Sequence, residues 1–544
     1  MFTYFKYSLL ISPVFFLTYL VRFNLGPIPT NLLEVLVGIF FLIWLYGIWK
    51  LKFPKPQFAN RWQWSAPLVF LVASTIAVAW TLTQLETQHM LVPLGIWKGW
   101  FIAPACYYLM LISTFKKKQD WWQLFEVSLG IAGLTAAVLI LQYFTGWFSD
   151  ITSTYDLRLV WPYLDPWTGL GASGNYPALF LAPFFCMGFN NLVYSPLSDT
   201  KLKKGWVDKS YGTLIVLALG VAIYLSKSYG SWIAIIGTCS LLSFLQTTGR
   251  KRWVTIPLLT VLAVGLLYFD QKNSEKFIFA TNTEEVSEQT IGSGEERRNI
   301  WATSWDLLVD SPIFGVGIGQ FQRSYEVKAP ITLSREVSRK EINHALHPHN
   351  TFLMFWLSTG FFGLLSFLYL LGVWGIPAPK DLRYLLWAPF IYLMAHGLIE
   401  VVYWKNDLAY SFWFFGALLA LAQNFNLVSG RVEHGLKIGK ELGFPTANMS
   451  LDLGLELDYG VYTVNVRVGK HKKKGLLYFG PRMTQGLPEN EVCEITIFDF
   501  DEDLYGQKVT FKIGSFVRGP MKFDSKKELK EQIQKDVLVA RNRK

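Results

Sequence analysis

The chain has 544 residues, of which 51% are hydrophobic and 17% charged, and its mean hydropathy is +0.27. This balance argues against a protein that is soluble throughout and is typical of one that crosses a membrane several times. The net charge of +11 does not by itself indicate nucleic-acid binding, because inner loops of membrane proteins collect Lys and Arg. We expect no nucleic-acid partner.

The first run is apolar but lacks a clear small-x-small cleavage site, so we expect a retained span rather than a signal peptide. Apolar runs of about 15–25 residues predict membrane-spanning helices. We expect about twelve: Tyr7–Val21, Leu32–Leu51, Ser65–Leu82, Gly95–Phe115, Trp122–Phe144, Pro177–Val193, Tyr211–Leu225, Tyr229–Leu245, Trp253–Phe269, Thr351–Val373, Leu385–Val402 and Leu408–Ala422.

Basic residues gather in every second loop between these runs. The clusters lie at residues 50–61, 116–118, 201–209, 250–252 and 380–383. Lys and Arg mark the cytoplasmic side of a membrane protein, so both termini are expected in the cytoplasm. The long polar segment 270–349 is then expected outside.

The pattern changes after Ala422. Short alternating segments such as "GVYTVNVRVG" and "EVCEITIFDF" replace the long apolar runs and predict a small β-barrel or sandwich. An amphipathic stretch, "DSKKELKEQIQKDVLVARN", predicts a helix behind it. The expected domains are therefore a polytopic helical membrane domain, 1–425, and a small β domain, 428–544.

The outer loop carries residues suited to chemistry on a phosphorylated lipid. Arg297 and Arg298 precede a short helical pattern, and His344, His347 and His349 cluster just before the run that begins at Thr351. A guanidinium orients and neutralises a diphosphate, and a neutral imidazole removes a proton from a hydroxyl. An interfacial polar role is an equally simple explanation for any one histidine.

The pattern Arg297-x-x-x-Trp301, "SPIFGVGIGQF" and "HPHN" followed by Gly360-x-x-Gly363 resembles the O-antigen ligase and polymerase superfamily. The resemblance covers roughly residues 1–425. It implies a multi-span glycosyltransferase that takes a glycan from undecaprenyl diphosphate, with His349 as the catalytic base and Arg297 or Arg298 on the diphosphate.

One departure concerns the family's Ser-Arg-Gly element. Its place is taken here by Ser228-Tyr229-Gly230, which lacks the arginine that meets the diphosphate. Lys227, next to this element, and Arg158, in the preceding outer loop, are the candidates to supply the charge.

The start of the β domain reads "GRVEHGLKIGKELGFPTANMSL". Its glycines allow backbone amides to approach phosphate oxygens; they are Gly435, Gly439 and Gly443. Thr446 and Asn448 offer hard oxygen ligands for Mg²⁺ on a nucleotide, although an ordinary turn would use the same residues. Glu494 lies in an otherwise apolar strand pattern, where a carboxylate is a candidate base.

These motifs, with "GVY", "DLYG" and Arg518-x-x-x-Lys522-Phe523, resemble riboflavin kinase over about residues 428–541. The resemblance implies a six-stranded β-barrel with a C-terminal helix. It implies transfer of the ATP γ-phosphate to riboflavin, giving FMN. Thr446 and Asn448 would hold the Mg²⁺-nucleotide, Glu494 would be the base, and Arg518 and Phe523 would contact the flavin. The family's Asn-Ile-Gly loop is altered here to Tyr478–Thr484, and no adenylyltransferase segment is recognisable, so FAD synthesis is not expected.

The two resemblances together predict a bifunctional transferase of the bacterial cytoplasmic membrane. Its expected partners are ATP, riboflavin, an undecaprenyl-diphosphate-linked glycan and membrane lipid. One alternative retains the glycan transferase but makes the tail a non-catalytic flavin or nucleotide sensor. A transporter is the weakest alternative, because charged residues within the runs are few and lie near their ends, mainly Glu34, Glu126 and Glu400.

Overall fold

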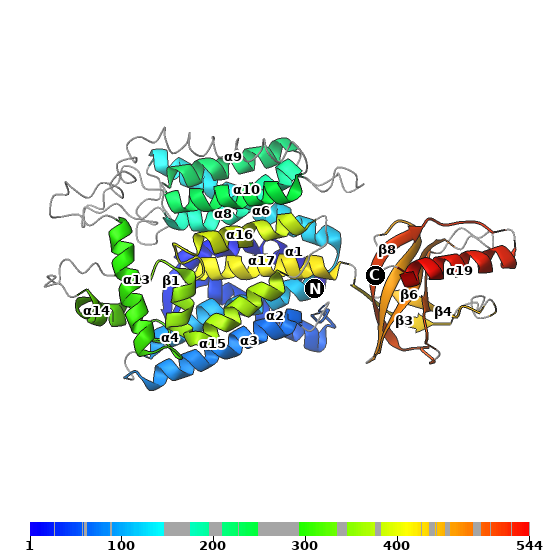
Figure 1. Cartoon of the computed structure of the whole chain (residues 1–544), viewed down its shortest axis with the longest axis horizontal. Helices are drawn as coiled ribbons and strands as arrows, with labels where there is room; N and C mark the ends of the chain where they lie inside the picture. The colour runs from blue at the N-terminus through cyan, green and yellow to red at the C-terminus, as the bar shows by residue number, and fades with distance from the viewer. Residues whose placement is uncertain are drawn as a thin grey trace. The chain divides into compact units, whose positions relative to one another are not determined.

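The computed structural model forms two compact units, Met1–Gln423 and Asn424–Lys544 (Figure 1). The residues that it describes are 1–26, 28–56, 58, 62–86, 90–145, 175–194, 209–226, 228–247, 293–333, 345–375, 382–425, 427–434, 441, 443–451, 457–469, 471–481, 491–500, 502–523 and 525–542.

The first unit is helical, apart from a hairpin of β1 (Arg22–Leu25) and β2 (Ile28–Asn31). Its helices are α1 (Phe2–Leu10), the 3-10 helix η1 (Ser12–Leu20), α2 (Leu32–Lys50), α3 (Trp62–Thr83), α4 (Leu91–Trp97), the π-helix η3 (Lys98–Ile102), α5 (Ala103–Thr114), α6 (Lys118–Thr145), α8 (Asn175–Tyr194), α9 (Lys209–Leu225), α10 (Tyr229–Gln246), α13 (Ser293–Asp310), α14 (Phe321–Thr332), α15 (Thr351–Trp374), α16 (Arg383–His396) and α17 (Asn406–Asn424).

Most long helices of this unit run lengthwise, and α13 crosses their ends (Figure 1). α17 lies at the centre, with every residue from Asp407 to Gln423 buried. Its Trp413 packs edge-on against Trp374 of α15 and Tyr108 of α5. A helix that is buried all round is one whose sequence is apolar all round, as this one nearly is.

The count of candidate spans among the described residues is lower than the expected twelve. Within the described residues, six helices are long and apolar enough to cross a membrane, and a shorter apolar helix covers Ser210–Leu225. The six are Leu32–Lys50, Trp62–Thr83, Lys118–Thr145, Tyr176–Tyr194, Tyr229–Gln246 and Thr351–Trp374. The run Tyr7–Val21 divides into α1 and η1 at a segment that contains Pro13, and Leu385–Val402 stops being helical at His396. The run Trp253–Phe269 lies outside the described residues.

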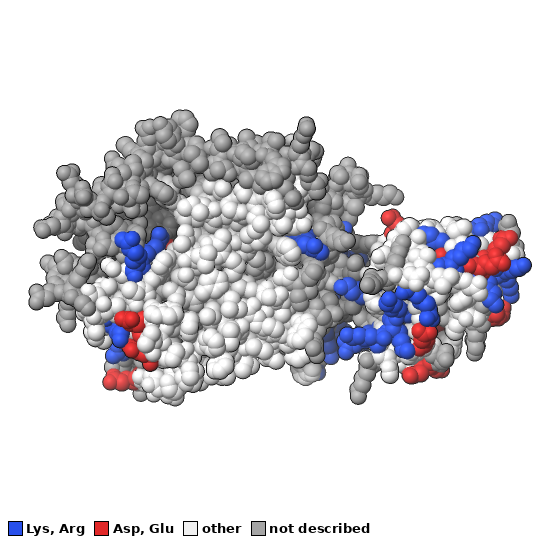
Figure 2. Space-filling model, in the orientation of Figure 1, with Lys and Arg blue, Asp and Glu red and all other residues white. Residues whose placement is uncertain are grey.

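The surface of the first unit fits a lipid environment. Figure 2 shows a broad uncharged band on this unit, with Lys, Arg, Asp and Glu towards its ends. Large apolar side chains on this surface are exposed, among them Leu42, Trp49 and Leu134. Exposed apolar area of this extent is characteristic of a surface that contacts lipid or a partner. The first unit thus has both the amino-acid composition and the apolar surface of a membrane domain.

A kink in α15 holds the glycine-rich turn of residues 315–319. Gly360 has non-helical φ and ψ angles of 73° and 179°, which leave the carbonyl of Leu357 without its helical partner. The amides of Val316 and Gly317 donate to that carbonyl, at 2.7 and 3.1 Å. In return, the amide of Phe361 donates to the carbonyl of Ile313 at 2.9 Å. The kink at Gly360 therefore admits the loop of residues 313–317 against the helix.

Replacing Gly360 with Ala is expected to destabilise the first unit by about 3 kcal/mol. The new Cβ would lie on the Ile313 carbonyl oxygen, and the positive φ angle disfavours any L side chain. The matched control is Gly372→Ala in the same helix, where nothing lies within 4 Å of the added Cβ. Thermal unfolding of the detergent-solubilised chain should separate the two variants. Equal melting temperatures would contradict this account of the kink.

The second unit is a closed six-stranded barrel, in the order β3-β4-β7-β6-β5-β8. The strands are β3 (Leu427–Glu433), β4 (Thr446–Leu451), β5 (Gly460–Val468), β6 (His471–Pro481), β7 (Glu491–Ile497) and β8 (Lys508–Arg518), and the helix α19 (Lys526–Asn542) follows. Alternate residues such as Val464, Leu477 and Phe511 fill the interior. The barrel and the C-terminal helix are as the sequence predicted.

Candidate active sites

The histidine segment of the first unit is held in an unusual conformation. His349 has a φ angle of +46°, a left-handed conformation that is uncommon for any residue except glycine. The next residue, Asn350, caps α15 by accepting hydrogen bonds from the amides of Phe352 and Leu353. The indole of Trp301, on α13, donates to the carbonyl of Pro348 at 2.8 Å. The backbone on both sides of His349 is therefore fixed.

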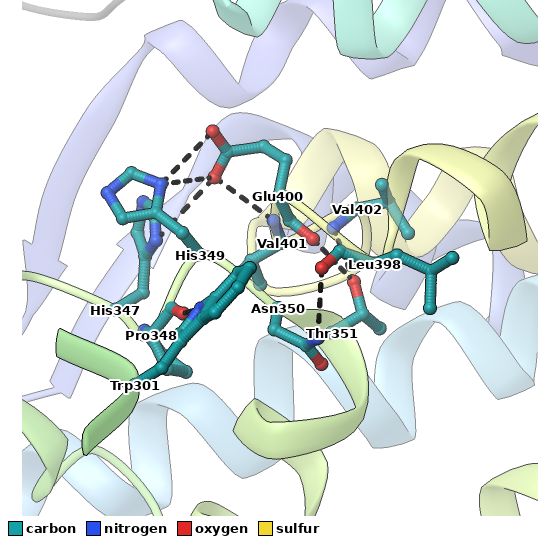
Figure 3. Close-up of polar contacts among 10 residues, drawn as sticks. All are labelled: Trp301, His347, Pro348, His349, Asn350, Thr351, Leu398, Glu400, Val401 and Val402. Atoms are coloured by element: carbon teal, nitrogen blue, oxygen red, sulfur yellow. Dashed lines mark hydrogen bonds and ion pairs between the residues drawn. The ribbon is translucent and has the colours of Figure 1, made fainter. Parts of the chain in front are cut away.

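Glu400 is the partner of His349 (Figure 3). It lies in the irregular segment between α16 and α17, and its side chain is 5% exposed. Its oxygens Oε1 and Oε2 lie 3.1 and 3.2 Å from Nδ1 of His349. The amide of Val401 also donates to Oε1, and the hydroxyl of Thr351 donates to the backbone carbonyl of Glu400. The first turn of α15 is thus tied to the segment that carries Glu400.

The protonation states in this cluster follow from burial and charge. Burial acts to raise the pKa of Glu400, but the hydrogen bond from His349 and the charges of the two nearby histidines outweigh it and lower the pKa to about 2. Burial lowers the pKa of His347 to about 4, so this ring is neutral near pH 7. An ionised carboxylate only accepts hydrogen bonds. Nδ1 of His349 is therefore the nitrogen that donates to Glu400, and Nε2 is the nitrogen left to face a substrate.

The structure distinguishes Arg297 from Arg298, which the sequence did not. Both lie on α13, where adjacent residues point about 100° apart and residues four apart share a face. Arg297 shares a face with Trp301, whose indole bonds to Pro348 in the histidine segment. The charge of Arg297 also contributes, after burial, to the lowered pKa of His347, whereas Arg298 is exposed. Arg297 is thus the arginine beside the cluster.

Sequence reasoning missed the role of Glu400. It treated this residue only as one of a few charges near the ends of apolar runs. The available signal was a carboxylate inside the apolar run Leu385–Val402, because such groups inside apolar segments are usually functional. Of the other residues proposed for this site, Lys227, Arg158 and His344 lie outside the described residues.

In the second unit, strand register brings the predicted residues into one row. Asn448 on β4 lies opposite Glu494 on β7, and Glu494 lies opposite Tyr478 on β6. The row continues through Val461 on β5 to Arg518 on β8. Residues directly opposite one another point to the same face, with Cβ atoms about 5 Å apart. Since the residues on either side of them on the strands fill the barrel interior, this row faces outward.

The side chain of Thr446 lies on the same face of the barrel. It alternates with Asn448 along β4, so both side chains point the same way, and both are half-buried. A hydroxyl and an amide oxygen beside the carboxylate of Glu494 form an oxygen donor set of the kind that Mg²⁺ takes. The residues present thus fit the metal that the sequence predicted.

Arg518 and Phe523 lie at the far end of this row. The guanidinium of Arg518 holds Asp536 of α19 through Nε, at 2.9 and 3.1 Å, and through a second nitrogen at 2.9 Å. It also lies over the ring of Phe523, with 5.8 Å between its central carbon and the ring centroid. Strand pairing places Tyr478 between Glu494 and Arg518. Burial raises the pKa of Tyr478, the charge of Glu494 also raises it, and that of Arg518 lowers it. Arg518 therefore positions α19 as well as bordering this face.

Two further motifs of the barrel meet in space. The ring of His434 stacks on that of Tyr505, with centroids 3.9 Å apart. The amide of Gly506 donates to the carbonyl of Val432, which joins the two segments. Gly443 has a φ angle of +87°, a conformation that requires glycine. Gly435 and Gly439 lie outside the described residues.

Comparisons with known proteins agree with this division. Residues 423–544 match the riboflavin kinase family model, and residues 214–368 match the O-antigen ligase family model. The riboflavin kinase segment is 37% identical over 116 residues to the bifunctional riboflavin kinase/FMN adenylyltransferase of Buchnera aphidicola from Schizaphis graminum. The match covers 21% of this chain and 37% of that protein.

Two other relatives are similar over the same part. The segment is 40% identical to the bifunctional riboflavin kinase/FMN adenylyltransferase of Haemophilus influenzae, over 21% of this chain and 37% of the relative. It is 35% identical to the RNA-binding riboflavin kinase RibR of Bacillus subtilis, over 22% of this chain and 50% of the relative. The chain thus spans half or less of the length of these relatives. It carries a segment that matches the O-antigen ligase family model, residues 214–368, ahead of a segment that matches the riboflavin kinase family model, residues 423–544.

Proposed function

We propose that the β domain of the second unit, residues 428–544, is a riboflavin kinase that transfers the γ-phosphate of ATP to the ribityl hydroxyl of riboflavin and forms FMN. The observation that carries this proposal is the row Asn448–Glu494–Tyr478, which places a carboxylate beside an oxygen donor set on one face of the barrel. The match of residues 423–544 to the kinase family supports it.

In this mechanism Glu494 takes the proton of the ribityl hydroxyl while the hydroxyl oxygen bonds to the γ-phosphorus and ADP leaves. Thr446 and Asn448 would hold the Mg²⁺ of the nucleotide, which neutralises charge on the phosphates. Gly435, Gly439 and Gly443 belong to the segment that would approach the phosphates through backbone amides. Arg518 and Phe523 would border the flavin. Most of the catalysis is positioning and charge neutralisation.

The test uses the purified full chain in detergent with riboflavin, ATP and Mg²⁺. FMN formation, followed by chromatography, supports the kinase. Binding of riboflavin or nucleotide without FMN would instead favour the sensor alternative, in which the altered segment Tyr478–Thr484 permits binding but not turnover. Absence of a nucleic-acid partner remains a prediction.

We propose that the membrane domain expected over residues 1–425 transfers a glycan from undecaprenyl diphosphate to an acceptor hydroxyl. The observation that carries this proposal is the pair His349–Glu400 beside Arg297. Nε2 of His349 takes the proton of the acceptor hydroxyl, whose oxygen then bonds to the sugar as the diphosphate leaves. Arg297 holds the diphosphate. Lys227 and Arg158 are proposed as further cations at that group.

The alternation of basic loops supports an orientation in the bacterial cytoplasmic membrane with both termini in the cytoplasm and the loop 270–349 outside. ATP and riboflavin would then meet the kinase unit on the inner side. Release of undecaprenyl diphosphate from a lipid-linked oligosaccharide, in membranes that contain the chain, tests the transferase. No release above membranes without the chain would reject it.

The two arginines of α13 should differ in effect. Arg297→Gln is expected to raise the KM for the lipid-linked glycan at least about 10-fold, because a charge-assisted contact to phosphate contributes roughly 1.5–3 kcal/mol. Arg298→Gln removes the same charge one residue away, on an exposed position, and should change KM less than about 3-fold. Release of undecaprenyl diphosphate at varied donor concentration measures both. Equal effects would contradict the placement of Arg297.

A further inference from the structure

Three possible metal ligands converge in the histidine segment. Within the described residues, His347, His349 and Glu400 each offer a ligand atom, and these atoms lie within 4.8 Å of one another. Nδ1 of His349 is 3.1 Å and Nδ1 of His347 is 3.6 Å from the same oxygen, Oε1 of Glu400 (Figure 3). The two imidazole rings meet edge to face, with centroids 4.4 Å apart.

One of these atoms has no hydrogen-bond partner in the described structure. Nδ1 of His347 is buried and forms no hydrogen bond there, although it points at the carboxylate. A buried polar atom without a partner is costly, so its position calls for an explanation. A cation bound between the three side chains would supply the missing partner.

The arrangement is held rigidly. Pro348 separates the two histidines and accepts the bond from Trp301, and His349 is locked in its left-handed conformation. Glu400 is fixed by the amide of Val401 through its side chain and by Thr351 through its backbone. Ligands that are already in place bind a metal without the loss of freedom that ordering a flexible loop would require.

The spacing and chemistry favour one class of ion. Zinc bonds to histidine nitrogen and carboxylate oxygen at about 2.0–2.2 Å, so ligand atoms at the corners of its tetrahedron are about 3.3 Å apart. The two measured separations, 3.1 and 3.6 Å, lie on either side of that value. Two imidazoles suit first-row transition ions, whereas Mg²⁺ and Ca²⁺ prefer oxygen alone.

We propose that His347, His349 and Glu400 bind a divalent transition ion of the Zn²⁺ class and that the bound ion switches off glycan transfer. The switch rests on the proposed function of His349. A metal ion on Nδ1 takes the place of the proton that faces Glu400, and that proton moves to Nε2 of the same ring. Nε2 then donates a hydrogen bond and no longer accepts a proton from the acceptor hydroxyl.

The binding test uses the full chain in detergent, stripped with EDTA and titrated with ZnCl₂ in a calorimeter. One equivalent is expected to bind, and both His347→Ala and His347→Gln should weaken this binding at least about 10-fold, as loss of a ligand costs no less than loss of its supporting contacts. His471→Ala removes an exposed imidazole from β6 and should leave the binding unchanged. No binding, or binding indifferent to His347, overturns the site.

The switch is tested by release of undecaprenyl diphosphate at increasing Zn²⁺. Inhibition with the midpoint of the binding titration, shifted at least about 10-fold in His347→Gln, supports it. Activation by Zn²⁺, or full activity with the site occupied, overturns it. If no transfer is detected even without metal, the proposed transferase fails, and the calorimetric titration still decides the metal site.

Discussion

Glu494→Gln should lower the rate of FMN formation by about 10²- to 10⁴-fold, the range that a positioned general base contributes. The amide has the size and shape of the carboxylate but cannot take a proton from the ribityl hydroxyl. Since Glu494 lies on the outward face of the barrel and not among the core side chains, the barrel should remain folded. Nucleotide affinity should change little, because the substitution leaves Thr446 and Asn448 in place.

The matched control for this variant is Glu491→Gln. Glu491 is on the same strand, is exposed and accepts a hydrogen bond from the hydroxyl of Tyr459 at 2.6 Å. The substitution Glu491→Gln removes the same charge at a position outside the row of Asn448 and Tyr478. The variant should therefore still form FMN. Steady-state rates and nucleotide binding on both variants form the measurement. Turnover by Glu494→Gln within about 3-fold of the parent chain would remove Glu494 from the role of base.

The second large effect is expected in the membrane unit. His349→Gln should lower glycan transfer by about 10²- to 10⁴-fold, because the amide cannot take the acceptor proton that His349 takes in the proposed reaction. Glu400→Gln should lower kcat by about 10- to 100-fold with little change in the KM for the lipid-linked glycan, since Glu400 positions His349 rather than touching the glycan. Release of undecaprenyl diphosphate measures both.

The double variant separates positioning from an independent role. If Glu400 acts through His349, His349→Gln with Glu400→Gln should be no slower than His349→Gln alone. Glu126→Gln, a half-buried carboxylate on α6, is the control for loss of a charge in the membrane unit and should remain active. FMN formation in the same preparations checks that each chain is intact. Full additivity of the two substitutions would reject the pairing.

The sequence by itself predicted a helical membrane unit followed by a small barrel. Long apolar runs and alternating segments are local patterns, and they report the environment of a helix or strand directly. Thr446 and Asn448 were predicted together as oxygen ligands from a short motif, and the structure then places both on β4, where a spacing of two puts them on one face. The number of spans was predicted less accurately from the sequence. A run such as Tyr7–Val21 is apolar enough to be a span but folds as two short helices.

Tertiary structure alone decided which distant residues meet. His349 and Glu400 are 51 residues apart, and only the packing of the first turn of α15 against the segment after α16 brings them together. The choice of Arg297 over Arg298 depends on which face of α13 touches Pro348, and the row through Asn448, Glu494 and Tyr478 depends on strand register. Local periodicity fixes the direction of a side chain relative to its own element. Its partner is set by the contacts between elements, which no local pattern encodes.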